Sequence, residues 1–255
     1  MSAQLPLIAR LTLRALGMAE SKRGVRRSMD PVATWLAREH PRFLASKDSV
    51  AAFATIRARC AIIDELLLDE VGRAKKLGIK LSLWTFGGGF DARWYRLRSV
   101  LGRGVHEFWD VEEGSVMGTK QELLDVSPFS PLWSQVNQLA APVKTWSLNI
   151  GEDENPVVIL EGLAGRMDLD AIGALLERIR AASTRAHVIV GLPATVSEPE
   201  RWSETFFSTK GWTLETDIRL GDRGRLLNER GMEMCNGMHG LRVIRLVARD
   251  FPEST

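Results

Sequence analysis

From residue 79 onward, short apolar runs alternate with amphipathic or turn-rich stretches, and this alternation restricts the fold more than any other feature of the chain. The runs that read as strands are IKLSLWTF, GVHEFWDV, VKTWSLNI, PVVILEG, AHVIVGLP, GWTLETDI and LRVIRLVAR. Between them stand helical patterns such as MDLDAIGALLERIRAAS, with an apolar stripe at Ile172, Leu175, Leu176 and Ile179. Strands interleaved with helices predict an α/β fold with a parallel, doubly wound sheet and helices on both faces. The last two runs have no helical pattern between them and are compatible with a closing hairpin.

The region before residue 79 is predicted to be helical. Along SVAAFATIRARCAIIDELLLDEVG, apolar residues recur three and four positions apart at Phe53, Ile56, Cys60, Ile63, Leu67 and Val71. This spacing predicts one buried helix face, with Ser49 as the N-cap and Gly72 as the end of the helix. We therefore expect residues 1–78 to form an N-terminal helical lid region and residues 79–255 to form the core, within one compact domain.

Composition and charge exclude several classes of protein. The chain has 255 residues, 45% of them hydrophobic, and a formal net charge of +2, which does not favour electrostatic binding of nucleic acid. Its two cysteines, Cys60 and Cys235, lie far apart and predict neither a zinc site nor a disulfide framework. No apolar run reaches the roughly 18 residues of a membrane span. We expect no metal ion, no nucleic acid or membrane partner, and a cytoplasmic location.

Three consecutive glycines, Gly87 to Gly89, follow the first predicted strand. This position is the edge of an open α/β sheet at which ligands bind, and glycine allows both positive φ and a close approach of backbone to ligand. A helix predicted to begin near Asp91 would direct its N-terminal amides to the same place. Asp110 and Glu112 follow about twenty residues later, where a carboxylate can accept hydrogen bonds from a ribose diol. The pattern predicts a nucleoside site.

Two nucleoside cofactors fit this pattern. Gly87, Gly89 and Ala92 match the G-x-G-x-x-A spacing of dinucleotide sites, which makes a nicotinamide-dependent oxidoreductase one hypothesis. However, residues 1–78 precede the first strand, and Asp91 would direct a carboxylate toward the pyrophosphate. S-adenosylmethionine (SAM) carries a sulfonium, an ammonium and a ribose, and it fits better with acids beside the turn. The sequence therefore favours SAM.

The stretch FGGGFDARWYRL resembles the L-G-A-G-L-D-T-R-x-Y-R-L motif of the leucine carboxyl methyltransferase family, which includes polyketide O-methyltransferases of the tetracenomycin carboxyl methyltransferase type. Further blocks match in the same order: ALGMAESKR with DPVA, RCAIID, WDVEEGSVMGTKQELL and VVILEGLAGRMD. In the third of these, the two acids of the family pattern are exchanged, with Asp110 for Glu and Glu112 for Asp. The likeness covers residues 15–180.

This resemblance implies a Rossmann-like class I methyltransferase fold, with a seven-stranded, mostly parallel sheet and an N-terminal helical lid. The residues that it assigns to SAM binding are Arg59, Gly87, Gly89, Asp91, Asp110, Glu112 and Glu161. Arg59 would pair with the methionine carboxylate, a charge-assisted contact that lysine does not reproduce. Glu112 would hold the ribose hydroxyls with Asp110 as a neighbour, and Glu161 would face the cofactor or the substrate cleft.

The chain departs from the family pattern at two turns. Ser147 and Asn149 stand in VKTWSLNIGEDENP where the family places an acid near the adenine, so adenine recognition is expected to differ and to use Asn149 or Glu152. The turn GLAGRMD after Glu161 lacks the usual Tyr-Leu pair. Because that turn borders the substrate, the resemblance does not identify the acceptor.

The charged residues of the first predicted helix allow two interpretations. Arg93 and Arg96 could tie that helix to neighbouring acids or contact a ligand. Asp64 is expected to cap its helix or to pair within it. Glu161 and His239, the latter in the glycine-flanked turn CNGMHGL, are the two weak candidates for a catalytic role.

Methyl transfer is an in-line displacement, so the protein mainly has to hold the nucleophile, methyl group and sulfur collinear. A carboxylate acceptor is ionised near neutral pH and needs no base, whereas a phenol or alcohol generally does. Since no histidine stands out in the sequence, the leading hypothesis is a SAM-dependent O-methyltransferase. It would act on a carboxyl or acidic hydroxyl of a small specialised metabolite, free or carrier-bound.

Three alternatives stay open. SAM itself could be cyclised with release of methylthioadenosine, which the altered turns after the third and fourth strands suggest. The nicotinamide-dependent oxidoreductase is a second alternative, and a SAM-binding protein that acts through a partner without catalysis is a third. The products separate methyl transfer from cyclisation, because the former yields S-adenosylhomocysteine.

Overall fold

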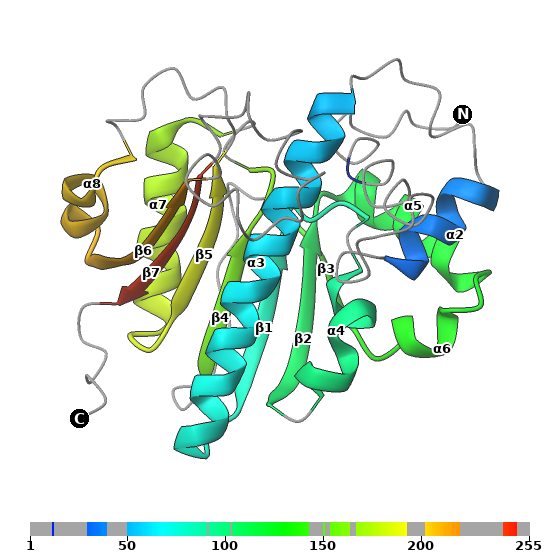
Figure 1. The fold of residues 1–255 in the computed structure, drawn as a ribbon, viewed down its shortest axis with the longest axis horizontal. Helices are drawn as coiled ribbons and strands as arrows, with labels where there is room; N and C mark the ends of the chain where they lie inside the picture. The colour runs from blue at the N-terminus through cyan, green and yellow to red at the C-terminus, as the bar shows by residue number, and fades with distance from the viewer. Residues whose placement is uncertain are drawn as a thin grey trace, which may run out of the picture.

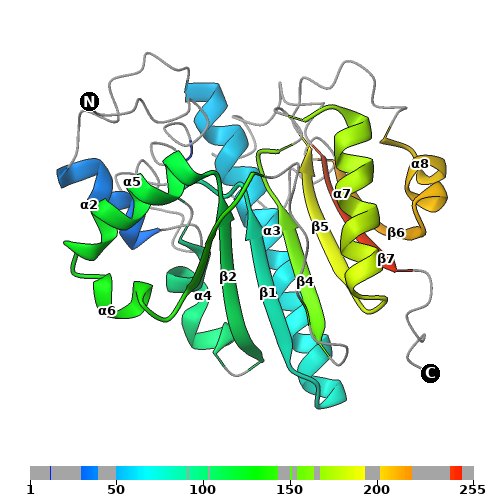
Figure 2. The same cartoon turned by 180° about the vertical axis from the view of Figure 1, so that it is seen from behind.

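A computed structural model of the chain describes residues 12, 30–39, 50–90, 92–102, 104–142, 150, 154–163, 167–192, 202–219 and 242–248. These residues contain a seven-stranded sheet of order β3-β2-β1-β4-β5-β7-β6, which Figure 1 and Figure 2 show from its two sides. The strands are β1 (Leu81–Phe86), β2 (Val105–Glu112), β3 (Asn137–Ala140), β4 (Asn155–Leu160), β5 (His187–Leu192), β6 (Trp212–Arg219) and β7 (Arg242–Ala248).

Parallel pairing joins β1, β2, β3, β4 and β5, and β7 lies antiparallel to both β5 and β6. This confirms the predicted mostly parallel sheet, and β6 and β7 form the antiparallel pair that the lack of an intervening helical pattern suggested. The chain builds the sheet outward from β1 to β3 and then returns to place β4 on the other side of β1. Such a reversal creates a crevice at the carboxyl ends of the two central strands, which is the usual ligand site of open α/β sheets.

Both faces of the central strands are buried. Every residue of β1 and β5 is buried, as is typical of parallel strands covered by helices on both sides. Successive side chains point to opposite faces: Leu83 belongs to the apolar cluster that includes the buried side of α3, whereas Trp84 belongs to the cluster that includes α7. The helices are α2 (Pro31–Glu39), α3 (Val50–Leu77), α4 (Arg93–Leu101), α5 (Gly114–Asp125), α6 (Ser130–Trp133), α7 (Leu169–Ala182) and α8 (Glu204–Thr209).

Helix α3 confirms the predicted apolar stripe but not the predicted end. Ile56, Cys60, Ile63, Leu67 and Val71 are all buried, whereas the Phe53 side chain lies outside the described residues. The helix passes through Gly72 and ends before Gly78, which has φ 69°. Glycine inside a helix costs only about 1 kcal/mol, so the helix can continue through it. The left-handed Gly78 ends the helix, and the N–H groups of residues 78 and 79 satisfy two of its last carbonyls.

The position of α3 bears on the expected lid. This helix belongs to the N-terminal region of the predicted division at residue 78, and it packs against β4, β5 and β7 on the face of the sheet seen in Figure 1. Helix α7 covers part of the opposite face, seen in Figure 2. The division at residue 78 and the closing motion of a lid remain predictions.

The third strand lies earlier in the chain than the sequence pattern suggested. The expected run at 143–150 falls almost entirely outside the described residues, whereas β3 is Asn137–Ala140 and pairs with the last four residues of β2. Its four residues are exposed or half-buried and carry no apolar run. Backbone pairing at the edge of the sheet forms this strand without the hydrophobic pattern by which strands are recognised.

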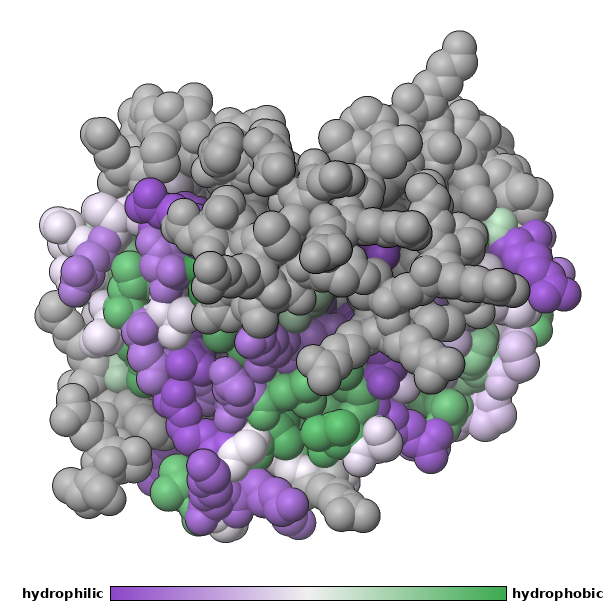
Figure 3. All heavy atoms as spheres, in the orientation of Figure 1, coloured by the Kyte–Doolittle hydropathy of each residue, from purple (hydrophilic) through white to green (hydrophobic). Residues whose placement is uncertain are grey.

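In the coloured part of the surface in Figure 3, hydrophilic residues predominate, and apolar side chains gather between α3 and α4. Among the described residues, the large hydrophobic side chains that are exposed are Leu77, Val100 and Val126. Scattered exposed side chains of this kind are ordinary on a protein surface. No helix in the part of the chain that the structure describes is long and apolar enough to cross a lipid bilayer.

Candidate functional site

The glycine turn after β1 has the positive backbone angles that the sequence suggested. Gly87 has φ 65° and Gly89 has φ 61°, in the left-handed region that favours glycine. A Cβ atom on Gly87 would lie 2.6 Å from Leu163 Cδ2 and 2.7 Å from the backbone oxygen of Glu161. Gly87 therefore permits the turn after β1 to pack against the turn after β4. Glycine is required here for packing, in addition to any close approach to a ligand.

Glu112 lies at the carboxyl end of β2 and reaches the glycine turn. Its Oε1 accepts a short hydrogen bond from the backbone N–H of Gly89, and the residue is 1% exposed. The structure thus brings together the glycine turn and the carboxylate that the sequence placed about twenty residues apart.

Asp110, two residues earlier, has a different partner. Its Oδ2 lies 2.6 Å from the Nζ of Lys120 in α5, and Lys120 also donates to the backbone oxygen of Gly89 at 2.7 Å. Lys120 is buried, with its Nζ 5.1 Å from the centroid of the Trp133 ring. Burial raises the pKa of Asp110, and the contact with Lys120 opposes that rise. Asp110 and Lys120 together hold the glycine turn from the side of α5.

Glu161, directly after β4, is a buried carboxylate with three donors around it. Arg59 Nε lies 3.2 Å from its Oε1, Arg93 donates to its Oε2 at 3.0 Å, and the Cys60 thiol donates to its Oε1 at 3.2 Å. Burial alone would raise the pKa of Glu161, but the charges of Arg93 and Arg59 lower it to about 2. The residue is therefore an ionised anchor for two arginines, and this protonation state does not suit a general acid.

Arg59 reaches Glu161 across a glycine of the neighbouring strand. A Cβ atom on Gly191 of β5 would lie 2.7 Å from Arg59 Cδ, so only glycine leaves room for the arginine stem. The sequence analysis did not single out Gly191, and its signal was a glycine inside an apolar strand, which often marks the close approach of another group. Arg59 is 7% exposed and enters its ion pair through Nε.

Arg93 and Arg96 tie α4 to buried acids. Arg93 Nε lies 2.6 Å from Asp64 Oδ1, and Arg96 forms a short ion pair with Asp64 Oδ2. These contacts support the first of the two interpretations of the arginines. Asp64 was expected to cap its helix or pair within it, and this was wrong, because its partners among the described residues lie on α4.

Asp30 is a site-forming residue that the sequence analysis did not identify. Its Oδ1 accepts from the backbone N–H of Ala33 at 2.9 Å and so caps α2, and its Oδ2 accepts from the N–H of Ala92 at 3.1 Å. The available signal was an aspartate directly before Pro31, the pattern of an N-cap with proline at the first helical position. The N–H of Ala92 at the start of α4 therefore donates to the residue that caps α2 and is not directed at a ligand.

Several predicted residues cannot be compared with the structure. Asp91, His239, Ser147, Asn149 and Glu152 lie outside the described residues. The described members of the predicted cofactor set, Arg59, Gly87, Gly89, Asp110, Glu112 and Glu161, all lie at or beside the carboxyl ends of the central strands or contact residues that do.

The low pKa of Glu161 predicts a particular loss of stability in acid. Because the pKa in the folded state, about 2, lies below the ordinary value of 4.5, this residue contributes stability that is present above pH 4.5 and lost as the pH falls through about 2. The contribution is up to about 3 kcal/mol. In urea unfolding at a series of pH values, Glu161→Gln should lose less free energy of unfolding over this range than the parent protein. The exposed Glu122→Gln control should follow the parent, and equal slopes for Glu161→Gln and the parent would contradict the expectation.

No protein-family model matches the chain, and no curated protein matches it. Solved structures do match, 253 chains in all. Glycopeptide N-methyltransferase MtfA complexed with SAM is similar to it at 11% identity and a TM-score of 0.46, over 70% of this chain and 86% of that one. Magnesium protoporphyrin IX methyltransferase from Synechocystis PCC 6803 with bound SAM is similar at 10% identity and a TM-score of 0.49, over 85% and 92%. N-methyltransferase NodS from Bradyrhizobium japonicum WM9 is similar at 12% identity and a TM-score of 0.46, over 73% and 97%. These values do not show a shared activity, and they do not confirm the resemblance to the leucine carboxyl methyltransferase family.

Proposed function

We propose that this protein is a SAM-dependent methyltransferase and that its acceptor is a carboxyl or acidic hydroxyl of a small metabolite, free or carrier-bound. The observation that carries the proposal is the meeting of Gly89 and Glu112 at the point where the strand order reverses between β1 and β4. A glycine turn with positive φ lets a ligand approach the backbone closely, and a buried carboxylate on the next strand can accept hydrogen bonds from the ribose hydroxyls.

In this proposal, Glu112 accepts from the ribose hydroxyls with the carboxylate that bonds to the Gly89 N–H in the structure. Arg59 meets the cofactor carboxylate through its two Nη groups, since its Nε is used by Glu161. The preference for SAM over a nicotinamide dinucleotide rests on Asp91 beside the glycine turn, whose carboxylate would repel a pyrophosphate and attract the ammonium of SAM.

The placement of the two described histidines supports the proposed acceptor. His106 lies near the start of β2 and His187 is the first residue of β5, so both stand at the edge of the sheet opposite the glycine turn. Within the described part of the chain, no imidazole lies beside the proposed site to take a proton. An acceptor that is already ionised near neutral pH needs none, so the protein would act by orienting the acceptor in line with the methyl–sulfur bond.

The proposal is tested by titrating the protein with SAM and with NAD in a calorimeter, followed by mass spectrometry after incubation with small carboxylic acids and phenols. S-adenosylhomocysteine formed only with an acceptor supports methyl transfer and names the acceptor class. Methylthioadenosine formed from SAM alone would instead support cyclisation of SAM. Binding of NAD without binding of SAM would overturn the proposal in favour of an oxidoreductase, and SAM binding without any product would favour a non-catalytic SAM-binding protein.

Arg59→Met is expected to weaken SAM binding about 10–100-fold, because it removes a charge-assisted contact while keeping the stem that packs against Gly191. Calorimetry measures the affinity. Arg73→Met is the matched control on α3, since Arg73 pairs with Glu215 on β6, and it should bind SAM as the parent does. An unchanged affinity in Arg59→Met would remove Arg59 from the cofactor site.

A further inference from the structure

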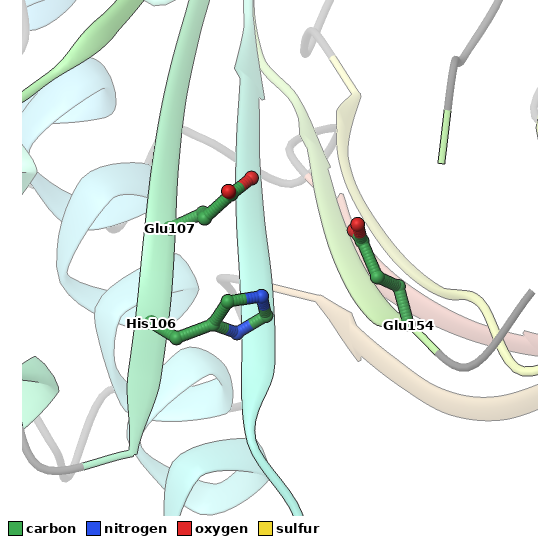
Figure 4. Close-up of side chains that lie close together, drawn as sticks. All are labelled: His106, Glu107 and Glu154. Atoms are coloured by element: carbon green, nitrogen blue, oxygen red, sulfur yellow. The ribbon is translucent and has the colours of Figure 1, made fainter. Parts of the chain in front are cut away.

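Three potential metal ligands meet on the sheet far from the glycine turn. One ligand atom from each of His106, Glu107 and Glu154 lies within 4.8 Å of the others. Figure 4 shows the three side chains on one side of the sheet, His106 and Glu107 from the start of β2 and Glu154 from the residue before β4. The strand order β2-β1-β4 means that the cluster bridges β1.

A β-bulge makes this meeting possible. Consecutive residues of a regular strand point to opposite faces, which would separate His106 from Glu107. Here Leu81 of β1 is opposite Val105 and Ser82 is opposite Glu107, so His106 is the extra residue on β2. A bulge re-aims a side chain, and bulges are over-represented beside functional sites. The irregularity therefore places an imidazole and a carboxylate from adjacent positions on the same face.

The contacts outside the cluster prepare two of its members for an ion. His106 Nδ1 lies 2.9 Å from the backbone oxygen of Leu81, and because a carbonyl only accepts, Nδ1 must donate. The neutral ring then carries its lone pair on Nε2. Glu107 Oε2 accepts from the indole Nε1 of Trp109 at 3.0 Å. Metal-binding histidines typically donate their other ring N–H to a carbonyl, and metal-binding carboxylates are themselves hydrogen-bonded. His106 and Glu107 each have a contact of this kind.

We infer that His106, Glu107 and Glu154 bind a divalent transition-metal ion, of which Zn²⁺ is the most suitable. One imidazole nitrogen and two carboxylate oxygens form a three-ligand set that leaves at least one position for water, an arrangement that zinc accepts. A site with an imidazole ligand binds Mg²⁺ and Ca²⁺ poorly, because these ions prefer oxygen ligands. Ligand atoms that share a tetrahedral zinc ion lie about 3.4 Å apart. Since the three ligand atoms already lie within 4.8 Å of one another, only a modest rotation of the side chains is required.

The ion would link β2 to the residue before β4. His106 is exposed while Glu107 and Glu154 are half-buried, so solvent reaches the site and an ion can enter. The site joins β2 to the beginning of β4 at the edge of the sheet opposite Gly89 and Glu112. It is therefore independent of the proposed cofactor site, and its failure would leave the proposed function untouched.

The test is a calorimetric titration of tag-free, chelator-treated full-length protein with Zn²⁺, and separately with Mg²⁺ and Ca²⁺. We expect one Zn²⁺ per chain and much weaker binding of the other two ions. His106→Ala and Glu107→Gln should each weaken Zn²⁺ binding at least about tenfold. Glu107→Gln retains an amide oxygen for Trp109, which limits damage to the fold. The exposed Glu122→Gln on α5 is the matched control and should bind Zn²⁺ as the parent does.

Thermal unfolding supplies a second readout that does not depend on activity. Zn²⁺ should raise the Tm of the parent and of Glu122→Gln but not that of His106→Ala, because a ligand stabilises only a folded state that binds it. Co²⁺ should partly quench tryptophan emission in the parent, since Trp109 contacts Glu107 and stacks on Trp84 at 4.6 Å between ring centroids. Absence of Zn²⁺ binding by the parent, or unchanged affinity in His106→Ala, would overturn the inference.

Discussion

Replacing Arg93 by alanine is expected to lower the free energy of unfolding by about 3–5 kcal/mol, the cost of removing one partner from a buried set of charges. Arg93 is 1% exposed and joins Asp64 on α3 to Glu161 after β4, at 2.6 and 3.0 Å. Without the guanidinium, each carboxylate loses a charge-assisted partner but stays in a place that excludes water. The desolvation cost therefore remains while the compensating attraction is lost.

Urea unfolding at neutral pH measures this effect, and Arg98→Ala is its control on the same helix. Arg98 is exposed, so its replacement should change the free energy of unfolding by no more than about 0.5 kcal/mol. The deficit of Arg93→Ala should shrink in acid, because protonation of Glu161 removes the same attraction from the parent protein. If Arg93→Ala were as stable as Arg98→Ala, the ion pairs of Arg93 would not hold α3, α4 and β4 together.

The sheet was accessible to prediction because its strands are buried on both faces. Such strands appear in the sequence as continuous apolar runs. The strands at 81–86 and 187–192 fall inside the predicted segments, and the strand at 155–160 begins one residue before its predicted segment. The proximity of the glycine turn and Glu112 was also predictable, since parallel strands bring their carboxyl ends to one edge. Both predictions use only the periodicity of the chain and the direction of its strands.

The remaining features depend on contacts between residues far apart in the sequence. Asp64 and Arg93 are 29 positions apart, and nothing in the helix of Asp64 indicates that its partners lie on α4. Gly191 has a role only because Arg59 crosses β5 there. The bulge that turns His106 depends on the pairing of β1 with β2, which leaves no mark in the sequence of either strand. Edge strand β3 lacks the apolar alternation that sequence analysis requires.

Glu112 and Asp110 occupy one strand two residues apart, and their replacement is expected to affect different properties. Glu112→Gln should weaken SAM binding about 10–100-fold, since it removes the charge that would hold the ribose hydroxyls. Its amide oxygen can still accept from the Gly89 N–H, so the free energy of unfolding should fall by about 1 kcal/mol or less. Calorimetry with SAM and urea unfolding of the same preparation give both values.

Asp110→Asn should instead act on stability, because it leaves the buried ammonium of Lys120 without its carboxylate at 2.6 Å. We expect a loss of about 3 kcal/mol or more in the free energy of unfolding. The double variant Asp110→Asn with Lys120→Met should recover part of this loss, since it removes both buried charges at once. The assignment would be reversed if Asp110→Asn abolished SAM binding without loss of stability while Glu112→Gln bound SAM normally. Asp110 would then be the acid that binds the ribose. If Glu112→Gln instead weakens SAM binding and Asp110→Asn lowers stability, then Glu112 binds the ribose, because Asp110 is already paired with Lys120.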